Sequence, residues 1–214
     1  MSDINGYLIV AACAAIVTFA VTPFVMSLAR LKNWMAQPDP RKVHTTPTPD
    51  VGGVALLVGI ITALLLAWQM DRFGPLFDGS SEMLGVAIAA IAICAIGFID
   101  DVREISAPAK VAGTAGVGMV LVWAGVTMFY FRVPYFDVFV LSNDWIPLVT
   151  ILWLLVMTEA INLIDGLDGL ATGSSAIIGI ALAVLAYVSS NYKFADYLNV
   201  MYIPNAEELV VFIS

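Results

Sequence analysis

Residues 7–29, YLIVAACAAIVTFAVTPFVMSLA, decide the fold class, because they form a long run without a single charged side chain. The hydrocarbon core of a bilayer is about 30 Å thick, and a helix of about 20 apolar residues crosses it. A helix also satisfies its own backbone hydrogen bonds, which lipid cannot do. The run therefore predicts a transmembrane helix.

Five more apolar runs follow along the chain. They cover residues 51–70, 83–99, 111–131, 146–164 and 170–189. Hydrophobic residues make up 61% of the chain and charged residues 12%, and the mean hydropathy is +0.94. This composition leaves too little polar surface for a water-soluble domain. We therefore expect an all-α polytopic membrane protein with about six transmembrane helices, forming a single domain over residues 1–214.

A seventh apolar run begins at Leu209 and is cut off at Ser214. A run of that length is too short to cross a bilayer. We therefore expect it to be the start of a seventh transmembrane helix, and the sequence to be the N-terminal portion of a longer protein.

The segment 130–141, YFRVPYFDVFVL, alternates aromatic and β-branched residues with other types. Such a pattern favours a short β-hairpin in the loop between two spans. The same aromatic residues would equally suit a belt at the membrane interface without any sheet. Both interpretations stay open at this stage.

Basic residues fall unevenly on the two sides of the predicted spans. One side holds Arg30, Lys32, Arg41, Lys42, Arg103 and Lys110, and the other holds Arg72, Arg132 and Lys193. An excess of basic loop residues marks the cytoplasmic side of a membrane protein. We therefore expect a multi-pass protein of the inner (plasma) membrane with its N-terminus outside. The loops at 30–50, 100–110 and 165–169 would then be cytoplasmic.

Polar motifs occupy these three loops, and the first of them is GFIDDVRE at residues 97–104, with Lys110 a few residues later. Asp100 and Asp101 are adjacent carboxylates at the end of a predicted span. Holding both there is costly unless a cation lies between them or one carries a proton. The motif therefore indicates either a ligand site or merely a solvated helix end.

The second motif is EAINLIDGLDGL at residues 159–170. Asn162, Asp165 and Asp168 are spaced three apart, so on a helix they would be near neighbours. The glycine after each aspartate ends the helix and lets backbone approach a ligand. A calcium-binding loop is the competing interpretation, but the EF-hand spacing is absent.

The third motif is DPRKVHTTPTPDVGG at residues 39–53. Arg41 and Lys42 are followed by His44, the only histidine in the chain, and by two glycines where the next span begins. This arrangement suits an anion-binding rim beside the acidic groups. A solvated loop without a ligand has the same composition.

Taken together, the three motifs favour a metal-assisted phosphate site. The carboxylates of Asp100, Asp101, Asp165 and Asp168 would repel a phosphorylated substrate unless a divalent cation intervened. Mg²⁺ suits such a site because it prefers oxygen ligands and bridges carboxylates to substrate phosphates, and Mn²⁺ is the alternative.

These three motifs, on one side of the spans, resemble the polyprenyl-phosphate N-acetylhexosamine-1-phosphate transferases. The Pro-Arg-Lys-Val-His sequence of the third motif is similar to that of the N-acetylglucosamine-1-phosphate branch. The phospho-N-acetylmuramoyl-pentapeptide transferase branch is the alternative. The resemblance implies transfer of a sugar 1-phosphate from a UDP-sugar to polyprenyl phosphate, giving a polyprenyl-diphosphate sugar and UMP. This reaction is the first membrane step of cell-wall or surface polysaccharide synthesis.

The resemblance also implies roles for individual residues. Asp100 would activate the lipid phosphate, with Asp101 beside it supporting the phosphate and magnesium site. Asn162 and Asp165 would belong to the metal and diphosphate region, and Lys110 would bind a phosphate. Asp168 with Gly166 and Leu167 would contact the uridine, and Arg41, Lys42 and His44 would shape the sugar-nucleotide side.

Two departures from the family pattern qualify these roles. Glu159 stands where the family commonly has Asn, which changes the charge beside the metal region. The later loops of the family, with a Gly-Asp-x-Gly-Ser metal motif and a histidine-containing sugar loop, are not in this sequence. We therefore expect the 214-residue form alone to have little or no activity.

Other classes of function and partner stay open. Intramembrane acids beside glycine-broken helices also occur in ion-coupled transporters. An inactive, truncated membrane protein that pairs with a full-length copy is a further alternative. We expect a UDP-sugar and a polyprenyl phosphate lipid as partners and no nucleic acid, and the sequence leaves a homodimer open.

Overall fold

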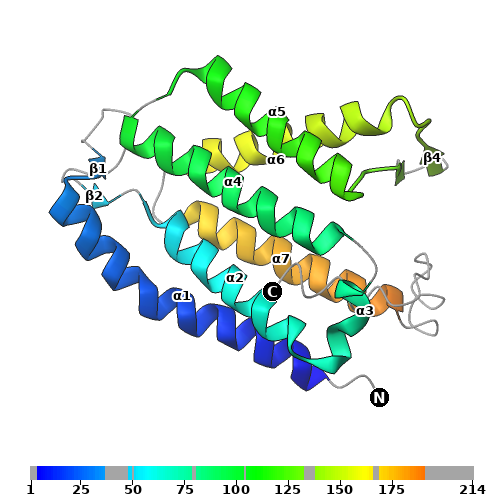
Figure 1. Cartoon of the computed structure of the whole chain (residues 1–214), viewed down its shortest axis with the longest axis horizontal. Coiled ribbons are helices and arrows are strands. Elements are labelled where there is room, and N and C mark those ends of the chain that lie inside the picture. The colour runs from blue at the N-terminus through cyan, green and yellow to red at the C-terminus, as the bar shows by residue number, and fades with distance from the viewer. Residues whose placement is uncertain are drawn as a thin grey trace.

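The computed structural model describes residues 4–36, 48–49, 51–78, 81–103, 105–132, 138–165 and 169–190. Most of these residues are helical (Figure 1). The long helices are α1 (Ile4–Lys32), α2 (Gly53–Trp68), α4 (Glu82–Arg103), α5 (Ala107–Ala124), α6 (Ile146–Ile164) and α7 (Leu170–Ser190). Between α2 and α4 lie the short 3₁₀ helix η1 (Asp71–Phe73) and the short α3 (Gly74–Phe77).

Helix length and composition establish a multi-pass membrane protein. Four described helices are long and apolar enough to cross a bilayer, namely Asn5–Lys32, Glu82–Arg103, Ala107–Ala124 and Ile146–Ile164. Two further apolar helices, Gly53–Trp68 and Leu170–Ala186, are shorter. The prediction of membrane-spanning helices is thus confirmed for four of the six apolar runs. The seventh run, which begins at Leu209, lies outside the described residues.

Several helix ends differ from their predicted positions, and the two largest differences at the ends of helices are in α5 and α4. The apolar run 111–131 is not helical throughout, because α5 ends at Ala124 and Gly125 adopts a left-handed conformation with φ +94°. The N–H of Val126 then donates to the Leu121 carbonyl oxygen at 2.9 Å, a common way to end a helix. In α4, the helix continues past the apolar run 83–99 to Arg103, so Asp100 and Asp101 of the first acidic motif are helical.

The helices pack mainly against their neighbours in the sequence, α1 on α2, α4 on α5 and α5 on α6, while α2 also packs on α4. Glycine permits the closest approaches. A Cβ atom built on Gly59 of α2 would lie 2.9 Å from the Ala14 carbonyl oxygen of α1. A Cβ on Gly118 of α5 would lie 3.2 Å from the Cα of Ile151 in α6. Small residues therefore set the spacing of these helices, as is usual in membranes.

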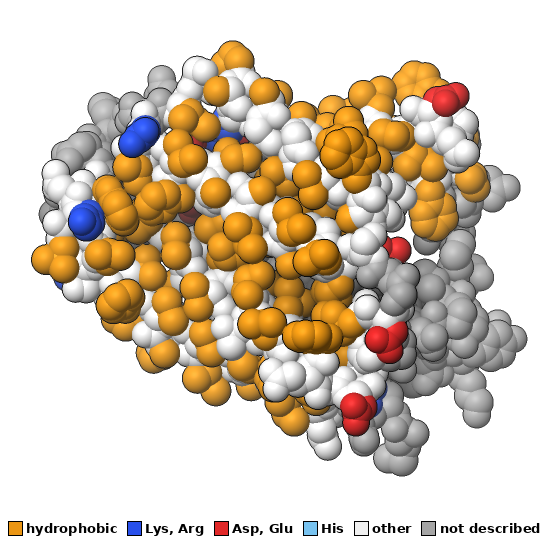
Figure 2. Space-filling model, in the orientation of Figure 1, with side chains coloured by type: hydrophobic (Ala, Val, Ile, Leu, Met, Phe, Trp, Pro, Cys, Tyr) orange, Lys and Arg blue, Asp and Glu red, His pale blue; other side chains and the backbone are white. Residues whose placement is uncertain are grey.

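A buried cluster joins α1, α2 and the short helix η1 at the end of the bundle that holds the N-terminus. It consists of Tyr7, Val10, Ala14, Ala63, Ala67 and Phe73. Tyr7 meets Phe73 edge-on, with ring centroids 5.4 Å apart. On the molecular surface, large hydrophobic side chains such as Phe19, Trp123 and Leu163 are about four-fifths exposed, and hydrophobic side chains cover the face shown in Figure 2. An apolar exterior of this kind suits contact with lipid.

Two short antiparallel strand pairs complete the described fold. β3 (Tyr130–Arg132) pairs with β4 (Val138–Val140), within the segment for which a hairpin or an aromatic belt was expected. The residues 133–137 between these strands lie outside the described part of the chain. β1 (Met35–Ala36) pairs with β2 (Thr48–Pro49), which the sequence did not predict. This second pair brings the two ends of the basic third-motif loop together.

Candidate active site

The polar motifs gather at one end of the bundle, at the left in Figure 1, where α4 and α6 end and α5 and α7 begin. We call this the motif end. Asp100 and Asp101 lie in the last turn of α4, Lys110 in the first turns of α5, and Asn162 in the last turn of α6. The structure thus brings the ends of both acidic motifs to the same side of the spans.

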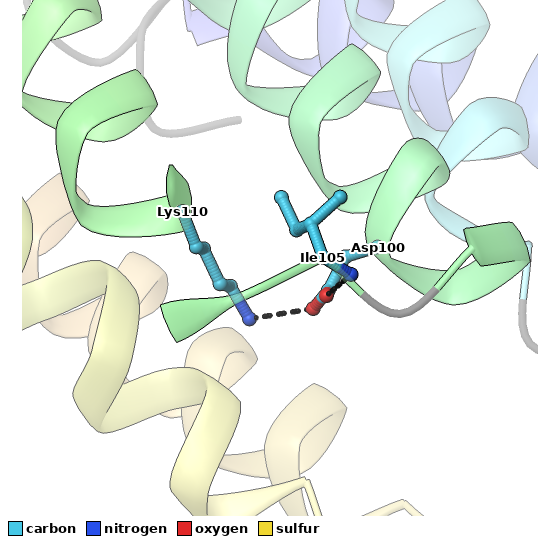
Figure 3. A network of polar contacts seen from close by, with 3 residues as sticks. All are labelled: Asp100, Ile105 and Lys110. Carbon is cyan, nitrogen blue, oxygen red and sulfur yellow. Dashed lines mark hydrogen bonds and ion pairs between the residues drawn. The ribbon is translucent and has the colours of Figure 1, made fainter. Parts of the chain in front are cut away.

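Asp100 is bound on both of its oxygens (Figure 3). Its Oδ2 accepts a hydrogen bond from the Nζ of Lys110 at 2.9 Å, forming an ion pair. Its Oδ1 accepts a hydrogen bond from the backbone N–H of Ile105 at 3.2 Å. The Lys110 and Asp100 side chains are 18% and 26% exposed. The pair is therefore partly shielded from water, and hydrogen bonds between charged groups are stronger than neutral ones.

The start of α5 explains how Lys110 reaches Asp100. Ser106 precedes the helix with extended backbone, and its carbonyl oxygen accepts hydrogen bonds from the N–H groups of Ala109 and Lys110. Pro108 stands in the first turn, where its missing N–H costs nothing. Because α5 begins so soon after α4 ends, its first turn lies beside the last turn of α4. This is why a lysine ten residues along the chain pairs with Asp100.

Asp101 has a different environment from its neighbour. It is exposed and lines a pocket of about 330 Å³ between α2 and α4. The walls of this pocket are mostly apolar and include Val54 and Ile60 of α2 and Ala90 and Phe98 of α4. Asp101 is its only charged lining residue among the described residues. The pocket thus offers apolar surface that leads to one carboxylate at the motif end.

The second acidic motif begins at the end of α6. Asn162 lies in the last turn, and Asp165 follows the helix as its C-cap with non-helical backbone; both are exposed. The helix therefore ends at Ile164, where the predicted run 146–164 ends. Gly169 has φ +78°, a conformation suited to glycine, and α7 begins at the next residue. Gly166, Leu167 and Asp168 lie outside the described residues.

The basic loop contributes less to the described site. Arg41, Lys42 and His44 all lie outside the described residues. The two glycines of that motif take their expected place, since Gly52 is the N-cap of α2 and Gly53 its first residue. A Cβ atom on either glycine would meet no atom of the described residues within 4 Å.

The Oε1 atom of Glu159 is buried and has no hydrogen-bond partner within the described part of the chain. It lies in α6 one turn before Asn162. Carboxyl groups in membrane spans are uncommon and usually face polar surroundings. The second motif therefore includes a third carboxyl group, one helical turn before Asn162, beside those of Asp165 and Asp168.

The donor atoms at the motif end fit a hard divalent cation. Asp101, Asn162 and Asp165 supply carboxylate and amide oxygens, the ligand type that Mg²⁺ prefers. Within the described ranges, however, no group of three His, Cys, Asp or Glu side chains is placed to hold a metal ion. The predicted metal and diphosphate roles of these residues therefore remain predictions.

A family model described as glycosyl transferase family 4 matches residues 83–206, more than half of the chain. The chain belongs to glycosyl transferase family 4. The matched range includes α4, α5, α6 and α7, and with them both acidic motifs and Lys110.

Two named relatives of this glycosyl transferase family 4 chain share the N-acetylglucosamine description. A Mycobacterium leprae protein named decaprenyl-phosphate N-acetylglucosaminephosphotransferase is 37% identical over 175 residues, 81% of this chain and 44% of that protein. A Bacillus subtilis protein named "Probable undecaprenyl-phosphate N-acetylglucosaminyl 1-phosphate transferase" is 35% identical over 167 residues, 78% of this chain and 44% of that protein.

A third relative carries the alternative description. A Phocaeicola vulgatus protein named phospho-N-acetylmuramoyl-pentapeptide-transferase is 30% identical over 231 aligned positions, which cover 82% of this chain and 52% of that protein. The chain thus spans about half the length of the curated relatives it matches.

Sequence reasoning missed three features of the site. It did not foresee the Ile105 N–H on Asp100, the pairing of Lys110 with Asp100, or the pocket that ends at Asp101. The spacing of Asp100 and Lys110 was the one available signal. It became informative only once the position of the first turn of α5 was known.

Proposed function

We propose that this glycosyl transferase family 4 chain serves the transfer of N-acetylglucosamine 1-phosphate from a UDP-sugar to polyprenyl phosphate. The observation that carries the proposal is the Lys110–Asp100 pair at the motif end, with Asp101 beside it. A partly shielded ammonium can bind a phosphate oxygen, and the neighbouring carboxylates require a cation before a diphosphate can approach. The names of the Mycobacterium leprae and Bacillus subtilis relatives support the sugar and the lipid.

The reaction itself joins a phosphate oxygen of the lipid to the phosphorus that carries the sugar. The bond from that phosphorus to the bridging oxygen breaks, and UMP leaves with the electron pair. The second pKa of a phosphate monoester is about 6, so the lipid phosphate is largely dianionic at neutral pH and needs little help from a base. The main work of the protein is therefore to position two anions and offset their charge.

Four of the described polar residues have a place in this scheme. Lys110 binds a phosphate oxygen. Asp101, Asn162 and Asp165 would hold Mg²⁺, or Mn²⁺ in its place. When bound, the cation supplies positive charge against the diphosphate.

The remaining predicted residues lie outside the described ranges and keep their proposed roles by resemblance. Asp168, Gly166 and Leu167 would contact the uridine. Arg41, Lys42 and His44 would bind the sugar-nucleotide side. Substitution of each by alanine should raise the KM for the UDP-sugar more than the KM for the lipid, which kinetic measurements with both substrates would separate.

The membrane arrangement is also part of the proposal. All six apolar helices, α2 and α7 included, would cross a plasma membrane within a single domain, with the N-terminus outside. The three motifs would then face the cytoplasm. The distribution of basic residues supports this orientation. Single cysteines at Ser2 and Ser106, in a variant without Cys13 and Cys94, should react with an impermeant thiol reagent from opposite sides of sealed vesicles.

The decisive experiment measures UMP release from UDP-N-acetylglucosamine and polyprenyl phosphate in membranes that contain the chain. Because the 214-residue form alone is expected to have little or no activity, we expect at most weak release, which requires Mg²⁺ or Mn²⁺, stops with a chelator, and is lost in Asp101→Asn. Asp144→Asn is the matched control, because Asp144 is an exposed carboxylate just before α6 begins, at the end of that helix opposite Asn162. Release that survives the chelator or the Asp101→Asn substitution would overturn the proposal.

A competition assay separates the two sugar branches. UDP-N-acetylglucosamine should outcompete UDP-N-acetylmuramoyl-pentapeptide as the donor. The greater identity to the N-acetylglucosamine relatives, 37% against 30%, favours this order. Preference for the pentapeptide donor would instead assign the chain to the muramoyl-pentapeptide branch.

A further inference from the structure

The two adjacent aspartates at the end of α4 are not equivalent. Consecutive helical residues point about 100° apart, since a helix has about 3.6 residues per turn. Asp100 accordingly faces α5 and binds Lys110, whereas Asp101 is exposed and lines the pocket between α4 and α2. Of the two, Asp101 is therefore the one that lines this pocket.

The contacts of Asp100 fasten the junction between α4 and α5. Its Oδ1 receives the Ile105 N–H from the connection between the helices, and its Oδ2 receives the ammonium of Lys110 from the next helix. A carboxylate has about four acceptor positions, so these two contacts do not exhaust it. They do fix the plane of the carboxylate, and they direct its charge toward Lys110.

Lys110 depends on this contact for its direction. A lysine side chain has a flexible four-carbon stem and three N–H donors. Among the described residues, Asp100 is the only group that accepts a hydrogen bond from Lys110, and the other two N–H donors of the ammonium have no acceptor among them. Without the carboxylate, the ammonium would be free to sample other rotamers. Its affinity for a phosphate oxygen would then fall, because binding would have to restrict the rotamers of the lysine side chain, at a cost in conformational entropy.

We propose that Asp100 is a positioning residue that acts through Lys110, holding its ammonium where a substrate phosphate binds, while Asp101 is the carboxylate that faces the ligand. This inference rests on the proposed function, because it requires a phosphate to be bound at Lys110. It replaces direct activation of the lipid phosphate by Asp100 with an indirect role.

A double-mutant cycle tests the proposal, using Asp100→Asn, Lys110→Met and the double variant. Asparagine keeps an oxygen that can accept the Ile105 N–H but removes the charge that holds Lys110. In the protein that retains Lys110, we expect Asp100→Asn to weaken polyprenyl phosphate binding about tenfold. In the Lys110→Met background, we expect the same substitution to weaken binding by no more than about twofold. Equal factors in both backgrounds would mean that Asp100 acts on the substrate directly, and would overturn the proposal.

Kinetics supply a second readout that a merely structural role would not move. A positioning role predicts that Asp100→Asn raises the KM for the lipid while the pH dependence of kcat keeps its shape. It also predicts partial rescue by Asp100→Glu, which restores the charge. A base acting on the lipid phosphate would instead lower kcat and remove the acid limb of the pH profile. That result would likewise overturn the proposal.

The wild-type chain distinguishes the two levels of failure. Wild-type protein that neither binds polyprenyl phosphate nor releases UMP would contradict the proposed function and this inference with it. Wild-type activity with independent effects of the two substitutions would contradict this inference alone. Thermal denaturation of the wild-type protein and of every variant checks that each is folded, so that a lost function is not mistaken for lost structure.

Discussion

Trp34 meets Phe98 edge-on, with ring centroids 5.0 Å apart and an angle of 90° between the rings. Trp34 follows the end of α1, where its backbone N–H donates to the Ala29 carbonyl oxygen at 2.9 Å. Phe98 lies two residues before Asp100 in α4. The pair therefore joins the end of the first helix to the turn that carries the two acids, and Phe98 also lines the pocket.

We expect Trp34→Leu to lower the free energy of unfolding by about 1 kcal/mol, because an edge-to-face aromatic pair contributes about 0.5–1.5 kcal/mol beyond its buried area. Thermal denaturation in detergent would measure the change. Trp34→Phe should retain most of the stability. Trp123→Leu is the control, since Trp123 is 82% exposed on the outside of α5 and should change little. Equal losses at both tryptophans would contradict the assigned role of the ring contact.

The spacing of α1 and α2 leads to a second prediction, at Gly59. A Cβ atom there would lie 2.9 Å from the Ala14 carbonyl oxygen and would also overlap the Thr18 hydroxyl. Backbone must move to admit it, and overpacking of this kind costs about 1–3 kcal/mol. We therefore expect Gly59→Ala to lower the melting temperature, although alanine is the better helix former.

Gly116 provides the matched control, because it also lies inside a helix but a Cβ there would meet no atom in the described part of the chain within 4 Å. Gly116→Ala should leave stability unchanged or raise it by up to about 1 kcal/mol. Melting temperatures of the two variants, measured side by side, would decide the matter. A stabilised Gly59→Ala protein would show that the two helices can separate at no cost.

The helices themselves were predictable because lipid imposes one strong rule on sequence. Long apolar runs must become helices, and the runs at 7–29, 83–99 and 146–164 did so. Helix ends were less predictable. The run 111–131 ended early as a helix because Gly125 adopts a left-handed conformation, which hydropathy does not detect.

The candidate site was predictable as a set of residue types but not as an arrangement. Adjacent carboxylates, Asn162 and Asp165 were all evident as motifs. The pairing of Asp100 with Lys110 was not, because it depends on where the first turn of α5 lies relative to α4. The β1–β2 pair was equally hidden, since Thr48 and Pro49 carry no strand pattern of their own.

Thr150 carries a third prediction, on hydrogen bonding in the membrane. It is buried, its Oγ1 donates to the Ile146 carbonyl oxygen at 2.7 Å, and the same atom accepts the Met128 N–H at 2.9 Å. Thr150→Val keeps the shape but leaves the Met128 N–H without its acceptor. Hydrogen bonds between segments in membranes contribute about 0.6 kcal/mol on average and up to about 1.7 kcal/mol. We expect a loss of about 1 kcal/mol, measured by thermal denaturation.

Thr62→Val is the control for this substitution. The Thr62 hydroxyl donates to the Val58 carbonyl oxygen of its own helix at 2.7 Å, and no described residue outside α2 bonds to it. That carbonyl oxygen keeps its helical hydrogen bond in the variant. Thr62→Val should therefore cost less than Thr150→Val. A reversed order would contradict the structural role of the Thr150–Met128 hydrogen bond.

Glu159 gives the last prediction, in which a substitution is expected to stabilise the protein. Its Oε1 is buried without a partner in the described part of the chain, and a buried polar atom without a hydrogen bond is costly. Replacing it by an apolar side chain removes that cost and adds to the apolar character of α6. We expect Glu159→Leu to raise the free energy of unfolding by about 1 kcal/mol, on the scale of one unsatisfied polar group.

The measurement is thermal denaturation of Glu159→Leu beside Asp100→Asn, since each carboxylate oxygen of Asp100 accepts a hydrogen bond, one from Lys110 and one from Ile105. The two variants should move in opposite directions, because one substitution removes an unpaired group and the other breaks an ion pair. UMP release from Glu159→Leu would show in addition whether the carboxyl serves the second motif at a cost in stability, as polar groups at functional sites often do. A lower melting temperature in Glu159→Leu would mean that the carboxyl has a stabilising partner in the folded protein, contrary to the contacts described.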